Sequence, residues 1–190
     1  HEREAFVPAL GELAGKRVGV DPERSVQAIF AALEEASATI VELRDPCVLA
    51  KAIKNEAEIA GHRAAKAARG AAPSRFLRWV SEGAPKGGVD ELSAAARLKS
   101  EREKTGALKD LSFDTISGAG PNGAVVHYRV SDETNRKLEP NSVYLVDSGG
   151  QYLDGTTDVT RTVWIGPDAP PAEIKDRFTR VLKGHIALAR

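Results

Sequence analysis

The sequence contains no methionine, only one cysteine and no net charge. With Cys47 alone, neither an intrachain disulfide nor a cysteine-based zinc site can form. Lysine plus arginine number 27, as do aspartate plus glutamate, so the charge balance gives no support to a nucleic-acid or polybasic membrane partner. The sequence has no apolar run of about 18 residues and no signal-peptide pattern. We therefore expect a soluble, cytoplasmic protein.

The two ends of the sequence suggest a piece of a longer protein. The chain begins at His1 without an initiator residue, and it ends at Arg190 inside an amphipathic helical pattern. We expect both ends to be cuts. The 190 residues and the 42% hydrophobic content are ordinary for one large globular domain, or for one and a half small ones.

Residues 1–50 have the pattern of an α/β unit. A short strand is predicted at Arg17–Val20, a helix at residues 24–36 and a second strand at residues 39–42. A strand, a helix and a strand in this order favour a parallel βαβ unit. Such a unit is too small to bury a core of its own. We place a domain boundary near Arg44-Asp45-Pro46, because proline disfavours helix in the residue before it.

Two helices are predicted in the middle of the chain. The first covers about residues 55–82, where Pro73 is a possible break, and contains His62, which we read as a solvated surface histidine. The second covers about residues 90–105, and its charge-rich end is predicted to be a solvated face.

Residues 112–130 are predicted to be mainly β-structure. A strand around residues 113–116 leads into the glycine-rich segment 117–123, and a further strand is predicted at residues 124–130, which include His127. The glycine-rich segment lacks the Lys-Ser/Thr pair and the following helix of a phosphate-binding loop. His127 fits either a half-buried strand histidine or a functional residue.

A β-hairpin is predicted around the turn dipeptide Asp154-Gly155. The first strand opens at residues 143–146 and is interrupted by Gly149 and Gly150, and the second covers about residues 157–165. A final helix begins at about residue 172. In the hairpin Asp147 ends the first strand and Asp158 begins the second, so both carboxylates can meet at one mouth of the sheet.

Two interpretations of this aspartate pair remain open on spacing alone. Paired carboxylates repel each other unless a positive charge lies between them, and carboxylate oxygens suit a divalent cation such as Mn²⁺, Mg²⁺ or Zn²⁺. Alternatively, both are turn and strand-end aspartates that cap their own backbone.

Three longer runs resemble the pita-bread metallopeptidases, a group that includes aminopeptidase P, prolidase and methionine aminopeptidase. They are Ser117–Ala124 leading into His127-Tyr128, the run Tyr144–Thr162, and Phe178–Ala187. Within this group the chain is most similar to aminopeptidase P, the Xaa-Pro aminopeptidases, over roughly residues 45–190. One departure is Gly150, where that family usually has alanine.

The resemblance implies an α+β fold: residues 51–190 form the first half of a pita-bread catalytic domain, and residues 1–50 form the end of a creatinase-like α/β N-terminal domain. It implies a metal site with two divalent ions, expected to be Mn²⁺, with Zn²⁺ or Co²⁺ as alternatives. Asp147 then binds one ion and Asp158 bridges both, while one histidine and two glutamates come from beyond Arg190. His127 then binds substrate and stabilises the tetrahedral intermediate.

The implied activity is release of the N-terminal residue from peptides with proline in the second position. The implied assembly is a homodimer. Because three ligands are absent, we expect residues 1–190 alone to be inactive. Two alternatives remain: a prolidase, which takes only Xaa-Pro dipeptides, and a metal-free relative that acts as a binding module.

Overall fold

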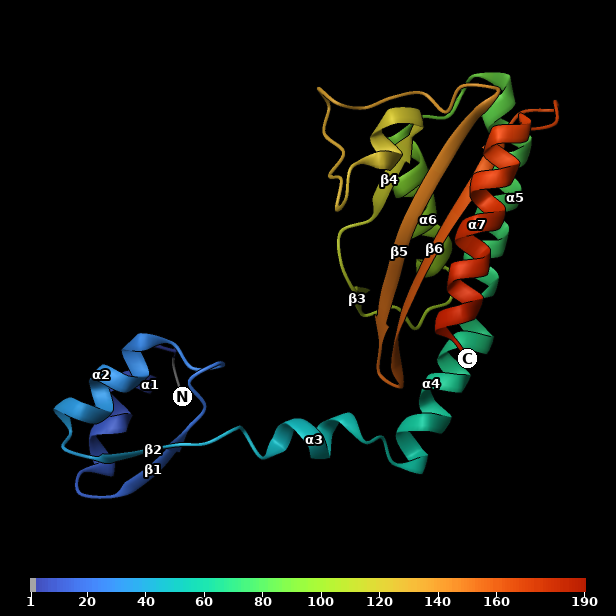
Figure 1. Cartoon of the computed structure of the whole chain (residues 1–190). Helices are drawn as coiled ribbons and strands as arrows, with labels where there is room; N and C mark the ends of the chain where they lie inside the picture. Colours follow the sequence, from blue (N-terminus) through green and yellow to red (C-terminus); the bar gives the residue numbers. More distant parts are fainter. Residues whose placement is uncertain (1–2) are drawn as a thin grey trace. The chain divides into compact units, whose positions relative to one another are not determined.

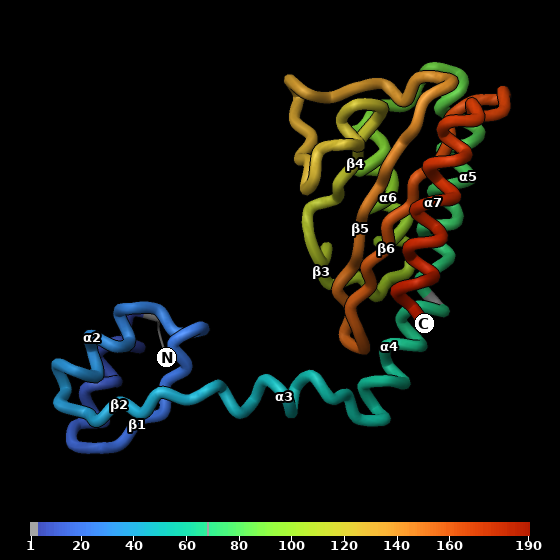
Figure 2. Tube along the Cα trace, viewed as in Figure 1, coloured from blue at the N-terminus to red at the C-terminus, as the bar shows by residue number. Residues whose placement is uncertain are grey.

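The computed structural model describes residues 3–190, apart from the side chains of Arg3 and Ala68, and divides the chain at Asn55–Glu56 into two compact units. The division falls nine residues after Pro46, near which we expected the boundary. Figures 1 and 2 show the course of the chain through the elements of each unit.

The first unit contains the predicted parallel βαβ arrangement. Strand β1 pairs in parallel with β2, in a register that places Arg17 opposite Thr39, and α2 connects the two strands. Its elements are η1 (Arg3–Ala5), α1 (Phe6–Ala9), η2 (Leu10–Leu13), β1 (Arg17–Val20), α2 (Gln27–Glu35), β2 (Thr39–Glu42) and α3 (Cys47–Ala52). Leu33 of α2 is fully buried, as expected for the inner side of a crossover helix.

The second unit packs helices against an antiparallel sheet. Its elements are α4 (Glu56–Arg69), α5 (Ala71–Gly83), η3 (Ala84–Lys86), α6 (Glu91–Glu103), β3 (Asp110–Leu111), β4 (Ile116–Ala119), η4 (Gly120–Ala124), β5 (Ser142–Tyr152), β6 (Gly155–Ile165) and α7 (Ala172–Leu188). Strand β5 is central: β6 pairs with one of its edges along the whole hairpin, while β3 and β4 pair with the other edge.

The core of this unit lies where α5 and α6 meet the sheet. Its buried members are Phe76, Val80, Ala84, Val89, Ala94, Leu98, Ala119, Leu138, Tyr144, Val146 and Ile165. The alternation along β5 explains this position, because Tyr144 and Val146 face the helices while Asp147 belongs to the opposite face.

The predicted long helix is divided at Gly70 rather than at Pro73. Gly70 separates α4 from α5, and Pro73 lies in the first turn of α5, where a missing N–H costs no intrahelical hydrogen bond. His62 is half-buried, and its ring packs against the Gly155 backbone at the hairpin tip. The prediction of a solvated His62 is therefore wrong.

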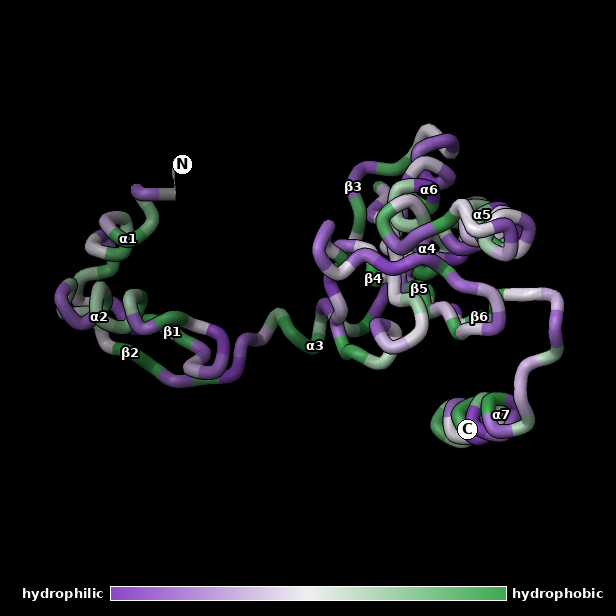
Figure 3. Tube along the Cα trace, turned by 90° about the horizontal axis from the view of Figure 1, so that it is seen from above, coloured by the Kyte–Doolittle hydropathy of each residue, from purple (hydrophilic) through white to green (hydrophobic). Residues whose placement is uncertain are grey.

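Helix α7 is amphipathic, but none of its residues is buried. Val181 and Leu182 are exposed, and Figure 3 shows the apolar positions of this helix next to polar ones. Of the helices in residues 3–190, none is both long and apolar enough to cross a lipid bilayer.

Candidate metal and substrate site

The β5–β6 hairpin brings the two predicted aspartates together on one face of the sheet. Asp147 lies opposite Thr160, and Asp158 lies opposite Gly149. Residues directly opposite one another in an antiparallel pair share a face, as do residues two apart in one strand. Asp147 and Asp158 are therefore diagonal neighbours on the same face.

The position of Asp147 within its strand differs from the prediction. Strand β5 continues without a break from Ser142 to Tyr152, so Asp147 lies in its middle, and the glycines that follow do not interrupt it. They permit close packing instead. A Cβ at Gly149 would collide with the Thr157 carbonyl and the Ser112 hydroxyl, and a Cβ at Gly150 would lie 2.8 Å from Leu108.

The electrostatics of the pair fit a cation site. Burial raises the pKa of Asp158, and the negative charge of Asp147 and a hydrogen bond with it raise this pKa further. The Oδ1 atom of Asp147 is buried without a hydrogen-bond partner among the described residues. In residues 3–190 no ion pair involves either carboxylate. A divalent ion would stabilise two repelling carboxylates of this kind and would give the buried Oδ1 atom of Asp147 a partner.

The donor set is incomplete. Within the described part of the chain, no group of three or more histidine, cysteine, aspartate or glutamate side chains is placed to hold a metal ion. The two aspartates could therefore supply only some of the ligands of a divalent ion, and residues outside the described part of the chain would have to supply the others.

A buried arginine lies behind the aspartate pair, on the helix side of the sheet. Arg102 of α6 is 1% exposed and donates to the Ser148 carbonyl at 3.1 Å and to the Thr157 hydroxyl at 3.4 Å. Ser148 follows Asp147 and Thr157 precedes Asp158, so one guanidinium links the two strands next to both carboxylates. The sequence pattern predicted a solvated face at the charge-rich end of this helix. The prediction is wrong for Glu101 and Arg102, which are buried, whereas Lys99, Glu103 and Lys104 are exposed.

A buried glutamate organises the segment that carries His127. Glu91, the first residue of α6, is fully buried, and its carboxylate accepts hydrogen bonds from the Ala119 amide at 2.7 Å and the Arg136 amide at 3.1 Å. It also accepts from Asn122 and from the Tyr128 hydroxyl, both at 2.9 Å. This network was missed in the sequence, because a glutamate next to a helix cap is usually exposed.

His127 lies in a turn and not in the predicted strand. The segment 124–130 has no strand; the Val125 amide donates back to the Asn122 carbonyl, and the Tyr128 amide donates to the Val125 carbonyl. The backbone of His127 has a φ of 55°, which a strand cannot contain. Its side chain is exposed.

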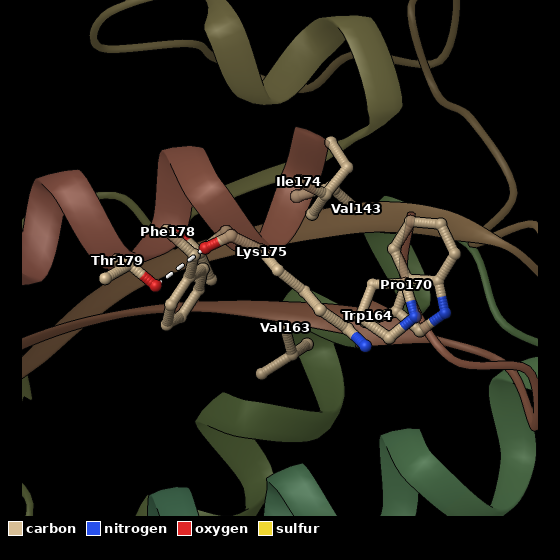
Figure 4. A pocket seen from close by; sticks show the side chains of 9 residues that line it. Val143, Val163, Trp164, Pro170, Ile174, Lys175, Phe178 and Thr179 are labelled. Atoms are coloured by element: carbon tan, nitrogen blue, oxygen red, sulfur yellow. Dashed lines mark hydrogen bonds between the residues drawn. The ribbon is translucent and has the colours of Figure 1, made fainter. Parts of the chain in front are cut away.

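An apolar cavity of about 460 Å³ lies further along the aspartate face, between the hairpin and α7. Figure 4 shows Phe178 and Ile174 of α7 and Val143, Val163 and Trp164 of the strands around it. Neither aspartate lines this cavity. The described residues of its walls offer apolar contacts, and Lys175 is the charged one among them.

Residues 57–190, well over half of the chain, match metallopeptidase family M24. The chain therefore belongs to this family. The fold agrees: the expected class, part of a pita-bread catalytic domain of mixed α and β structure, is confirmed.

The relatives include Xaa-Pro aminopeptidases. The chain is 48% identical over 158 residues to Xaa-Pro aminopeptidase ApepP of Drosophila melanogaster, a match of 82% of this chain and 25% of that protein. The crystal structure of the Caenorhabditis elegans X-prolyl aminopeptidase, described as a cytosolic enzyme with a di-nuclear active site, matches with a TM-score of 0.85 and 34% identity, over 100% of this chain and 32% of that chain.

The prolidase from Pyrococcus furiosus has the same fold, with a TM-score of 0.77 and 20% identity over 94% of this chain and 50% of that one. The chain thus spans about a quarter of the length of the curated relative from Drosophila and about a third of the nematode structure.

Proposed function

We propose that this chain is part of a metal-dependent aminopeptidase that releases the N-terminal residue from peptides with proline in the second position. The observation that carries the proposal is the pair Asp147 and Asp158, which share one face of the hairpin and include a buried oxygen without a hydrogen-bond partner. The names of the fruit-fly and nematode relatives support the substrate class.

In this proposal the two carboxylates are metal ligands. Asp147 would hold one divalent ion and Asp158 would bridge two, with Mn²⁺ as the expected metal and Zn²⁺ or Co²⁺ as alternatives. When bound, such ions lower the pKa of a shared water and polarise the carbonyl of the scissile bond. The di-nuclear site described for the nematode relative supports the count of two.

The role proposed for His127 is to bind substrate and to donate a hydrogen bond to negative charge that develops on the carbonyl oxygen. Its exposed ring is open to a ligand. The Glu91 network fixes the neighbouring Tyr128, so the segment that carries the imidazole is anchored on a buried group.

The rest of the proposed protein follows from the resemblance. Residues 1–50 would end a creatinase-like N-terminal domain, residues 51–190 would form the first half of the catalytic domain, and a histidine and two glutamates beyond Arg190 would complete the metal site. We further propose a homodimer in the cytosol; the cytosolic nematode relative supports the location.

The experiment compares two proteins, the full-length protein and residues 1–190 alone, each supplied with Mn²⁺. We expect the full-length protein to cleave an Xaa-Pro-Xaa tripeptide after its first residue and the shorter chain to be inactive. Cleavage by residues 1–190 alone would refute the missing-ligand argument. Turnover of Xaa-Pro dipeptides only would indicate a prolidase, and binding without turnover by the full-length protein would indicate a metal-free binding module.

A further inference from the structure

A second cavity, of about 360 Å³, lies on the helix side of the hairpin, between β6 and the junction of α4 with α5. Four of its lining residues carry positive charge: Lys66, Arg69, Arg102 and Arg161. Among the described residues that line it, Asp158 is the acidic one, and its side chain belongs to the opposite face of β6 from Thr157 and Arg161. Positive side chains therefore outnumber negative ones on the described lining, although Arg69 is paired with Asp154.

Arg102 is the buried member of this set. Its side chain is 1% exposed, and its three hydrogen bonds go to the Ser148 carbonyl and to the hydroxyls of Ser148 and Thr157, all neutral acceptors. No carboxylate within residues 3–190 forms an ion pair with it. The adjacent Glu101 is already shared by Arg75, Arg97 and Lys104. A buried charge without a counter-charge is costly, and a bound anion would remove that cost.

Arg69 is held in place at the same cavity. Its Nη1 donates to Asp154 at 2.8 Å, and its guanidinium carbon lies 4.5 Å from the centroid of the Tyr152 ring. The side chain is 13% exposed, so its orientation is fixed before any ligand arrives. Lys66 and Arg161 are exposed, and Arg161 donates a hydrogen bond to the Thr160 carbonyl at 2.7 Å.

A second observation concerns Arg102. Its Nε atom is buried and has no hydrogen-bond partner among the described residues. A buried N–H donor without a partner is unusual in folded proteins, and Arg102 is one of the residues that line the cavity.

We propose that this cavity binds a small tetrahedral oxyanion of the phosphate or sulfate type. The guanidinium groups of Arg102 and Arg69 would supply N–H donors, and the exposed Lys66 and Arg161 would add positive charge. The walls formed by Pro73 and Leu77 limit the space to a small ligand. The site lies on the opposite side of the sheet from the aspartate pair and is independent of the proposed peptidase activity.

The experiment titrates inorganic phosphate into the full-length, metal-free protein by isothermal calorimetry, so that no metal ion can bind the anion. We expect one saturable site per chain with a dissociation constant in the low-millimolar range or tighter. Lys66→Gln and Arg161→Gln should each weaken binding about two- to fivefold, since each removes one exposed charge. Arg102→Gln should abolish binding, and Arg102→Lys should restore part of it.

Lys99→Gln is the matched control, because Lys99 is an exposed cation of α6 outside the cavity; phosphate affinity should not change. If Arg102→Gln does not fold, the two exposed variants still decide the result. The proposal is overturned if the wild type shows no saturable binding, or if both exposed variants bind phosphate like the Lys99 control. Acetate that binds as tightly as sulfate would overturn the tetrahedral class.

Discussion

Replacing Glu91 with alanine removes the buried carboxylate that joins α6 to the segment from Ala119 to Arg136. Two backbone N–H groups, at Ala119 and Arg136, donate to this carboxylate at 2.7 and 3.1 Å. The hydrogen bond from Ala119 is buried, whereas the one from Arg136 is part-buried. A buried donor that loses its acceptor costs about 1–3 kcal/mol, so we expect the free energy of unfolding to fall by about 1–3 kcal/mol through Ala119, with a smaller loss through Arg136. Glu91→Gln, which retains one acceptor oxygen, should lose less.

Urea denaturation followed by tryptophan fluorescence measures this change, because Trp79 and Trp164 are the only tryptophans and both lie in the second unit. Glu82→Ala is the matched control: Glu82 forms an exposed i,i+4 pair with Arg78, and its loss should change stability by no more than about 0.5 kcal/mol. If Glu91→Ala lowered the free energy of unfolding no more than this control does, the hydrogen bonds of Glu91 would not be what holds the segment that carries His127.

Two further predictions use other features of the same unit. Gly61→Ala should destabilise the protein by about 1–3 kcal/mol, because the new Cβ would collide with the Asp154 carbonyl. Gly184→Ala is the control and should stabilise the protein slightly, because Gly184 lies in α7 with open space around it. If both variants shifted the urea midpoint equally, the close packing of α4 on the hairpin would be contradicted. Hydrogen bonds from Arg75 and then Lys104 lower the pKa of Glu101 to about 2, so its contribution to stability is present above pH 4.5 and is lost as the pH falls towards 2. Glu101→Gln should therefore flatten the decline of the urea midpoint between pH 5 and pH 2.5, and an unchanged decline would contradict the assignment.

Local signals were sufficient for most of the elements. The Asp154-Gly155 turn between β-branched runs predicted the hairpin, and the fold-back at this turn led us to expect Asp147 and Asp158 at one mouth of the sheet. The parallel pairing of β1 with β2 followed from the order of strand, helix and strand.

The errors arose where tertiary contacts override local pattern. Val125 and Val126 suggested a strand. The carboxylate of Glu91, which is distant in the sequence, instead accepts a hydrogen bond from Tyr128, and residues 125–127 form a turn in which both valines are exposed. The glycines after Asp147 suggested an interruption, although they serve close packing inside a continuous strand. The buried Glu91, Glu101 and Arg102 could not be found from periodicity, because each lies among charged or polar neighbours on a helix that shows no clear apolar face.

The central claim is that Asp147 and Asp158 hold divalent metal together. Titrating Mn²⁺ into the metal-free full-length protein, with free Mn²⁺ followed by electron paramagnetic resonance, tests it directly. Our account predicts two bound ions in the wild type and the loss of at least one in Asp147→Asn and in Asp158→Asn. Asp176→Asn, which changes an exposed aspartate of α7 paired with Arg180, should bind like the wild type. Full Mn²⁺ binding by both hairpin variants would contradict the account.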